Sequence, residues 1–366
     1  MTTTVRPRTP AELAVLVPYQ LGYHPRSSLI LTAVDGRRLG LLQRHDLTAD
    51  PDHCPQIARE AVAILELEDA TAVVVMAFEE EDGSSAPLRE AVLAEAETNG
   101  LTVREHLVVR DGRWFAPDCR EACCPEDGLP LPCPEDVPAV AAFVHAGVAP
   151  WRSREQLVEE VLPEPDEERA GRILVRVQLL LDLAVATGTL AERGPRLADD
   201  WRAILDPDPS ALPVADLGDA LLARAAVSLE DVHWRDVLMG GLCPGTFPVR
   251  VDELPETTEV ARGATDRCPW ATAAGPDDHA DEVLAVRTRL VELVRLLPVG
   301  LTPPALTLVA HLAWWCGDGT VAAIALRRAL EVDPSYRLAG LMEQLLMHGV
   351  RPWDATSTSA MVGRRS

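Results

Sequence analysis

Lysine is absent from this chain of 366 residues, and asparagine occurs only once, as Asn99. All 34 positively charged side chains are therefore arginine. A chain without lysine forms no Schiff base with pyridoxal phosphate or a carbonyl substrate, and it has no P-loop or kinase lysine. A serine nucleophile elbow, a His-Glu-x-x-His zinc motif and a Gly-x-Gly-x-x-Gly loop are absent as well. These absences exclude several enzyme classes and leave no recognised catalytic motif.

Positive charge is scarce relative to negative charge, because 57 acidic side chains give a formal net charge of -23. An acidic surface disfavours nonspecific binding to nucleic acid or anionic lipid. No apolar segment of signal-peptide length precedes Pro18, and no later window approaches the length of a membrane span. We therefore expect a cytoplasmic protein with no nucleic-acid or membrane partner. Its eight cysteines are expected to be thiols or metal ligands, not disulfides.

The strongest local signal is the dipeptide Asp35-Gly36, which lies between two apolar runs in the stretch 20–47. Such a dipeptide predicts a β-hairpin with a two-residue turn. The turn fixes the register and predicts two pairs near the open end of the hairpin: Ser27 with Arg44, and Arg26 with His45. Alternate residues are apolar on both faces, so we expect the hairpin to lie inside a sheet and not at an open edge.

The order of periodic segments predicts an α/β domain followed by a mainly α-helical one. The α/β domain covers residues 1–116 and has a mixed sheet in the order β-β-α-β-α-β-β. Residues 117–136 are rich in cysteine and proline and are interpreted as a loop or linker. The helical domain covers residues 137–353, and residues 354–366 are expected to form a disordered tail.

Local signals place several elements within these domains. Thr9 to Glu12 forms a capping box that begins a short helix, and Pro18 is expected to stop this helix. The continuous apolar run 71–78 predicts a strand that is buried on both sides. Asp111-Gly112 predicts a second tight turn, and the stretch 242–276 is expected to be irregular.

The most regular helix signals lie near the end of the helical domain. Residues there follow the spacing of the second half of a tetratricopeptide repeat: Gly317, Ala322, Leu326, Ala329 and Pro334. Small residues in such a repeat allow two helices to approach closely. The aromatic positions of the repeat's first helix are missing, so we expect one tetratricopeptide-like helical hairpin and not a solenoid.

Polar residues gather at the open end of the predicted hairpin and at the second turn: His24, Arg26, Ser27, Ser28, Arg44, Asp46, Arg110 and Asp111. Arginine side chains there could receive an anion, and His24 or His45 beside Asp46 resembles a general base with its orienting carboxylate. Pairs across strand ends are also common structural ties. We favour a binding or regulatory module with a polar pocket, whose partner is a protein or a small anionic ligand. The alternative is a hydrolase-type enzyme that uses a cluster of five residues: His24, Arg26, Ser27, Arg44 and Asp46.

The linker contains four closely spaced cysteines: Cys119, Cys123, Cys124 and Cys133. Thiolates bind zinc tetrahedrally, and a loop with few apolar residues gains stability from one ion. Adjacent cysteines rarely both ligate one ion, so a zinc site needs three of these thiolates and a histidine such as His106 or His145. Disulfide or redox behaviour and simple thiols are the alternatives. A bound zinc ion would make the protein a zinc-stabilised adaptor.

Six motifs of the chain resemble, in their order, an actinobacterial family known as domain of unknown function 4192: LGYHPRSSLIL, RHDL, RDGRWF, ACCPEDGLPL, VHWRDVLM and PPALTLVAHLAWWCGDGTVAAIALRRALEVDPSYRLA. The resemblance covers nearly the whole chain. It implies a bacterial cytosolic protein and transfers no activity. Family members typically have valine at the position of His45, so the resemblance argues against a catalytic His45. It directs attention to Arg44 with Asp46.

Overall fold

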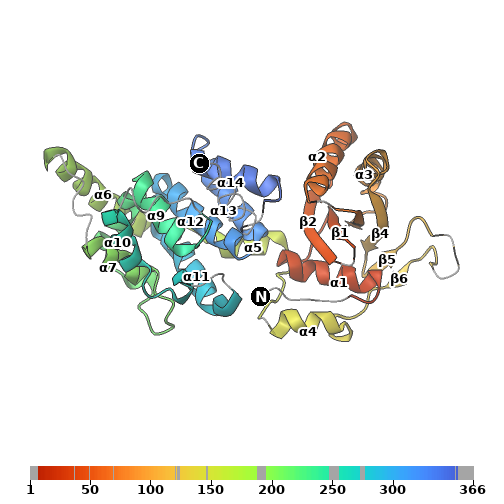
Figure 1. Cartoon of the computed structure of the whole chain (residues 1–366), viewed down its shortest axis with the longest axis horizontal. Helices are drawn as coiled ribbons and strands as arrows, with labels where there is room; N and C mark the ends of the chain where they lie inside the picture. Colours follow the sequence, from red (N-terminus) through yellow and green to blue (C-terminus); the bar gives the residue numbers. More distant parts are fainter. Residues whose placement is uncertain are drawn as a thin grey trace, which may run out of the picture. The chain divides into compact units, whose positions relative to one another are not determined.

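The computed structural model describes residues 7–36, 38–48, 50–68, 70–119, 121, 124–145, 147–187, 195–246, 255–272, 277–350 and 352 (Figure 1). The chain divides into two units, residues 2–157 and 158–366. The division falls within helix α5 (Arg154–Val161), which lies further along the chain than the predicted linker at 117–136. The predicted disordered tail at 354–366 lies outside the described residues.

The first unit is built on a mixed sheet of six strands in the order β2-β1-β3-β4-β5-β6. In chain order the strands are β1 (Ser28–Asp35), β2 (Arg38–Asp46), β3 (Ala72–Phe78), β4 (Thr102–Arg110), β5 (Arg113–Phe115) and β6 (Leu129–Pro130). Strands β3 and β4 are parallel, and every other neighbouring pair is antiparallel. The predicted α/β class with a mixed sheet is confirmed. Strand β6 was not predicted, and it lies within the cysteine-rich stretch.

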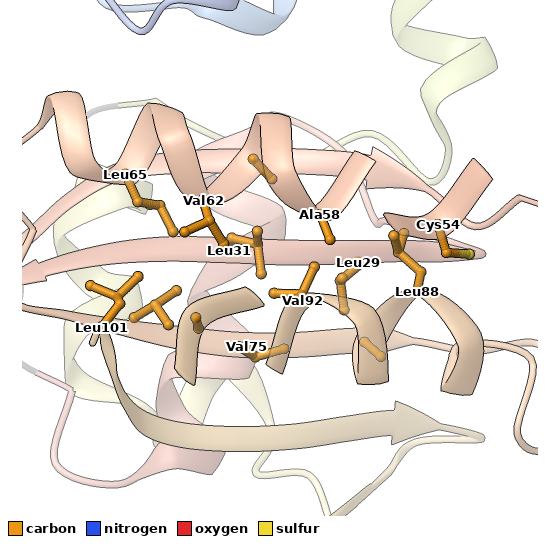
Figure 2. Close-up of a cluster of buried hydrophobic side chains, with 14 of the residues drawn as sticks. Leu29, Leu31, Cys54, Ala58, Val62, Leu65, Val75, Leu88, Val92 and Leu101 are labelled. Carbon is orange, nitrogen blue, oxygen red and sulfur yellow. The ribbon is translucent and has the colours of Figure 1, made fainter. Parts of the chain in front are cut away.

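Helices cover both faces of this sheet (Figure 1). The helices of the first unit that precede α5 are α1 (Pro10–Leu21), α2 (Cys54–Leu67), α3 (Ala86–Thr98) and α4 (Pro138–His145). Figure 2 shows the core on one face, where Leu29 and Leu31 of β1 and Val75 of β3 meet Val62 of α2 and Val92 of α3. On the other face, α1 packs with α4. Because both faces are covered, all of β3 is buried, which confirms the prediction for the apolar run 71–78.

The register of the β1–β2 hairpin differs from the predicted register. The observed pairs at its open end are Ser28 with Asp46, Leu29 with His45 and Ile30 with Arg44. Two features cause the difference. Asp35 belongs to the strand and pairs with Arg38, with Gly36 after it at a positive φ of 57°, and β2 has one extra residue between Leu39 and Leu42. The predicted pairs of Ser27 with Arg44 and of Arg26 with His45 are therefore wrong.

The position of the hairpin in the sheet was also predicted incorrectly. Strand β1 is internal, but β2 is an edge strand of the described sheet. One face of β2 still contacts a helix, because the side-chain amide of Gln43 donates a hydrogen bond of 3.1 Å to the carbonyl of Ala61 in α2. Apolar residues on both faces of the hairpin therefore indicate that helices pack on the two faces of the sheet. They do not indicate that both strands of the hairpin have a neighbouring strand on each side.

Pro18 does not stop the first helix. Helix α1 contains Pro18 and continues to Leu21, where Gly22 ends it at a φ of 79°. Val17 and Leu21 on either side are buried, and this burial offsets the backbone hydrogen bond that proline removes. The predicted N-cap at Thr9 is confirmed, since the Oγ1 of Thr9 accepts a hydrogen bond of 3.2 Å from the backbone N–H of Glu12. The reciprocal bond of a capping box is not formed as predicted, because the Glu12 carboxylate accepts from the backbone N–H of Arg8, at 2.7 Å, and not from that of Thr9.

The second unit is helical in all its described elements. Its helices beyond α5 are α6 (Glu167–Thr187), α7 (Pro195–Ile204), α8 (Asp219–Ser228), α9 (Val232–Leu242), α10 (Pro255–Ala264), α11 (Ala280–Leu296), α12 (Thr302–Trp315), α13 (Gly319–Val332) and α14 (Arg337–Met347). Helix α10 lies in the stretch 242–276, which was predicted to be irregular. Helices α12 and α13 form a hairpin at Gly317, and its resemblance to a tetratricopeptide repeat stays a prediction. Among the described helices, none is both long and apolar enough to cross a bilayer.

Candidate functional site

Four strand ends meet at one edge of the sheet in the first unit. Ser28 at the start of β1 pairs with Asp46 at the end of β2 and with Phe78 at the end of β3. Phe78 in turn pairs with Val109 near the end of β4. We call this the carboxyl edge, because the parallel strands β3 and β4 both end there, and we define it by eight residues: Ser27, Ser28, Arg44, Asp46, Glu79, Glu80, Asp82 and Arg110. Most of the sequence-predicted site residues are thus brought to one edge.

Ser27 has an unusual backbone conformation at this edge. Its φ of 42° lies in the left-handed region, which non-glycine residues seldom adopt. The Oγ of Ser27 donates a hydrogen bond of 2.7 Å to Oε2 of Glu80, and its carbonyl accepts one of 2.9 Å from Leu47. The neighbouring Ser28 is fully buried and donates to the carbonyl of Arg26 at 2.6 Å. Ser27 is therefore held in place by groups on both sides, whereas Ser28 has a structural role.

Glu79 is a buried carboxylate at the N-terminus of α3, with a side chain that is 2% exposed. Its Oε1 accepts hydrogen bonds from the backbone N–H and the Oγ of Ser85, at 3.0 and 2.5 Å. Its Oε2 accepts from the N–H of Gly83 at 3.3 Å and from Arg110 at 2.8 Å. A carboxylate in this position interacts favourably with the positive end of the helix dipole. Glu79 therefore fixes the start of α3 to the end of β3.

Arg110 contacts two carboxylates and an aromatic ring. Besides Glu79, its Nη1 donates to Asp82 at 2.5 Å, and its guanidinium lies 4.9 Å from the centre of the Phe115 ring. Asp111, which follows it, has a positive φ of 51° and forms the predicted tight turn with Gly112 between β4 and β5. Both residues therefore have structural roles, which the sequence alone did not distinguish from ligand binding.

Arg44 is engaged less completely. Its side chain is 16% exposed, and its Nη2 donates to Oδ1 of Asp46 at 2.5 Å. The Nε of Arg44 is buried and has no hydrogen-bond partner among the described residues. Burial raises the pKa of the nearby Tyr23 hydroxyl, and the positive charge of Arg44 opposes this effect. The Nε and Nη2 donors lie on the same side of the Arg44 guanidinium. Asp46 accepts from Nη2, and Nε is left without an acceptor.

Neither histidine forms the expected base and carboxylate pair with Asp46 in the described contacts. Successive strand residues point to opposite faces, so His45 points away from the face that carries Arg44 and Asp46. The Nε2 of His45 lies 3.1 Å from Oε1 of Gln43, and burial lowers the pKa of His45. The backbone N–H of His24 donates to the carbonyl of Trp151 at 2.9 Å, and burial lowers the pKa of His24 as well. A general base at His45 is not supported by this arrangement.

The cysteine-rich stretch is described in part. Cys119 and Cys124 are half-buried and Cys133 is exposed, while Cys123 lies outside the described residues. The two histidines proposed beside them differ, because His145 is exposed, whereas the Nδ1 of His106 lies 2.6 Å from Oδ2 of Asp118. In the described part of the chain, no three His, Cys, Asp or Glu side chains are grouped as metal ligands. Zinc binding here stays a prediction.

Four residues of this region were not among those predicted from the sequence: Glu79, Glu80, Asp82 and Ser85. Each belongs to the acidic run 79–85, which directly follows the buried strand β3. Ligands of α/β sheets bind beyond the carboxyl ends of parallel strands, so an acidic run in this position is a usable signal.

The chain thus belongs to the class of proteins that join an α/β unit to a helical unit, and the strands of its α/β unit end in polar residues. A family model described as Domain of unknown function (DUF4192) matches residues 10–247 and 249–353. The chain belongs to this family, which confirms the resemblance of its six motifs. Neither the curated proteins nor the solved structures include a match to the chain.

Proposed function

We propose that this protein is a binding module whose carboxyl edge takes a small anionic ligand, with Arg44 as the main contact. The unused Nε–H of Arg44 carries this proposal. A buried donor without a partner costs about 1–3 kcal/mol, so native structures normally supply it with an acceptor such as a water or an ion. An oxygen of a phosphate or carboxylate would be such an acceptor.

The geometry of Arg44 supports an anion. Carboxylates and phosphates bind arginine through two parallel hydrogen bonds, and Nε with Nη2 is one such pair of donors. Asp46 takes only Nη2, and its side chain is 73% exposed. A ligand that takes the place of Asp46 could therefore bind Nη2 and Nε together. Arg110 differs from Arg44, because its Nη1 already binds two carboxylates and none of its nitrogens is a buried donor without a partner among the described residues.

The location supports the same proposal. The edge beyond parallel strands is where α/β sheets bind their ligands. Strained backbone conformations cluster at binding sites, and Ser27 has one at this edge. We therefore assign Ser27 to the border of the proposed site, next to its partner Glu80.

Helix α6 favours a binding role over an enzymatic one. Five large apolar side chains on this helix are exposed: Leu174, Val175, Leu179, Leu181 and Leu183. Several exposed apolar side chains on one helix are consistent with a contact site for another molecule. A module that responds to a ligand and contacts another molecule accounts for this surface.

The test is a thermal-shift and calorimetric screen of the full chain with inorganic phosphate, pyrophosphate, ATP and citrate. A ligand at 100 times its dissociation constant stabilises the folded protein by about 2.7 kcal/mol, which raises Tm by several degrees. Arg44→Gln is expected to abolish the shift. Arg59→Gln, which removes the same charge from an exposed position on α2, is expected to leave it unchanged. A shift that survives Arg44→Gln, or no shift with any of the four probes, would contradict the proposal.

A further inference from the structure

A pocket of about 190 Å3 lies at the edge of the sheet opposite the carboxyl edge. Its floor is apolar and comes from three parts of the first unit. Leu13 belongs to α1, Val34 and Leu39 belong to the β1–β2 hairpin, and Val74 belongs to β3. The charged residues Arg8, Arg104 and Glu105 form part of the rim. No motif of the sequence indicated this pocket, because its lining residues come from four separate segments.

Two strand irregularities border the pocket. Strand β2 has its extra residue directly after Leu39. Strand β4 has another, because Val73 pairs with Val103 but Val74 pairs with Glu105. Successive residues of a regular strand point to opposite faces, whereas a bulge turns a side chain toward a new direction. Arg104 is the extra residue, and both it and Glu105 line the pocket.

The rim carries two opposite charges side by side. Arg8 is already neutralised, because it forms an ion pair of 2.7 Å with Glu12. The Nη1 of Arg104 donates at 2.7 Å to the carbonyl of Gly36, and no carboxylate of the described chain is within ion-pair distance of this guanidinium. Burial raises the pKa of the half-buried Glu105, and Arg104 opposes this effect only in part. Both groups would therefore gain from a partner of opposite charge.

We propose that this pocket binds a free apolar α-amino acid. The carboxylate of the ligand pairs with Arg104, its ammonium pairs with Glu105, and its side chain lies on the floor formed by Leu13, Leu39 and Val74. An enclosed cavity of about 150 Å3 holds benzene. This pocket is open to solvent, and its volume of about 190 Å3 leaves room for an aliphatic side chain of leucine size to lie on its floor.

The charge pattern favours an amino acid over other apolar ligands. A fatty acid would satisfy Arg104 but leave Glu105 unpaired, and an alkylamine would do the reverse. The carboxyl terminus of a peptide would present an amide where the amino acid presents an ammonium. This site lies at the other edge of the sheet from the proposed anion site, so each proposal stands or fails without the other.

The test is isothermal titration calorimetry of the full chain with three probes. L-leucine carries both charges, 4-methylpentanoate lacks the ammonium, and N-acetyl-leucine imitates the carboxyl terminus of a peptide. Leucine is expected to bind at one site, at least tenfold more tightly than either analogue. Arg104→Gln is expected to weaken leucine and 4-methylpentanoate alike, by at least tenfold. Glu105→Gln is expected to weaken leucine alone.

Two matched variants serve as controls for these substitutions. Arg59→Gln and Glu90→Gln make the same changes at exposed helical positions and are expected to leave leucine binding unaltered. Circular dichroism of each variant confirms that it is folded. The absence of leucine binding, or leucine binding that neither pocket substitution weakens, would overturn the proposal. Equal affinity for N-acetyl-leucine would overturn it in favour of a peptide carboxyl terminus.

Discussion

Replacing Glu79 with glutamine is the sharpest test of how the carboxyl edge is held together. The substitution keeps the shape of the side chain and removes its charge. In Glu79, each oxygen accepts two hydrogen bonds, and three of the four donors come from Ser85 and Gly83. In either orientation of a glutamine amide, its NH2 group would face N–H or O–H donors in place of an acceptor. The ion pair with Arg110 would be lost as well.

The expected cost follows from these contacts. A hydrogen bond to a charged group contributes about 1.5–3 kcal/mol, and a carboxylate at a helix N-terminus adds about 0.3–1 kcal/mol. We therefore expect Glu79→Gln to destabilise the first unit by roughly 2–4 kcal/mol. Glu81→Gln makes the same change two residues away at an exposed position and is expected to cost less than about 0.5 kcal/mol.

Hydrogen exchange measured by mass spectrometry on the full chain separates the two units. Peptides from β3, α3 and β4 are expected to lose protection in the Glu79→Gln variant. Peptides from α12 and α13 in the second unit serve as an internal reference and are expected to be unchanged. If Glu79→Gln and Glu81→Gln lose equal protection, the buried carboxylate does not fix α3 to the sheet and the reasoning is refuted.

Three further predictions concern single positions. In urea unfolding, the Ser27→Gly variant is expected to be more stable than the Ser27→Ala variant by up to about 1–2 kcal/mol. Both substitutions remove the hydroxyl, but only glycine adopts the positive φ of this position without strain. Equal stabilities of the two variants would show that no strain is stored there. Gly128→Ala would place a Cβ 2.7 Å from the Phe115 ring, so it is expected to lower the unfolding free energy by at least 1 kcal/mol more than Gly112→Ala, which has the same sign of φ and open space. Burial lowers the pKa of His311 from 6.5 to about 4, so the unfolded chain takes up a proton before the folded chain does. Stability of the second unit is therefore expected to fall as the pH drops from about 6.5 to about 4, by roughly 3 kcal/mol, and His311→Phe is expected to flatten this dependence in unfolding experiments at pH 7 and pH 4.5.

The sequence predicted features that depend on neighbouring residues. The N-cap at Thr9, the buried strand β3 and the tight turn at Asp111-Gly112 are each encoded within a few positions, and the structure confirms all three. The family was identified from motifs that extend over most of the chain, and the family model confirms it.

Features that depend on distant contacts were not predicted. The register of the first hairpin depends on an extra residue in β2, and no local sequence pattern predicts this residue. Glu79 lies in an acidic run that is typical of a solvated loop, and its burial depends on how the chain folds back to place Gly83, Ser85 and Arg110 around its carboxylate. The pocket combines Leu13 with Val74 and Glu105, which are far apart in the sequence. Tertiary packing decides all of these features.

The extra residue in β2 also affects how the sheet meets its surroundings. An edge strand offers unpaired backbone groups that can recruit a strand from another chain. Continuous pairing along β2 would have to pass the irregular step between Leu39 and Leu42, where the spacing of donors and acceptors changes. A strand from another chain could therefore form regular backbone hydrogen bonds with β2 only over the short stretches before and after this step. The same residue that shifts the hairpin register is thus expected to make β2 a poor template for a strand from another chain.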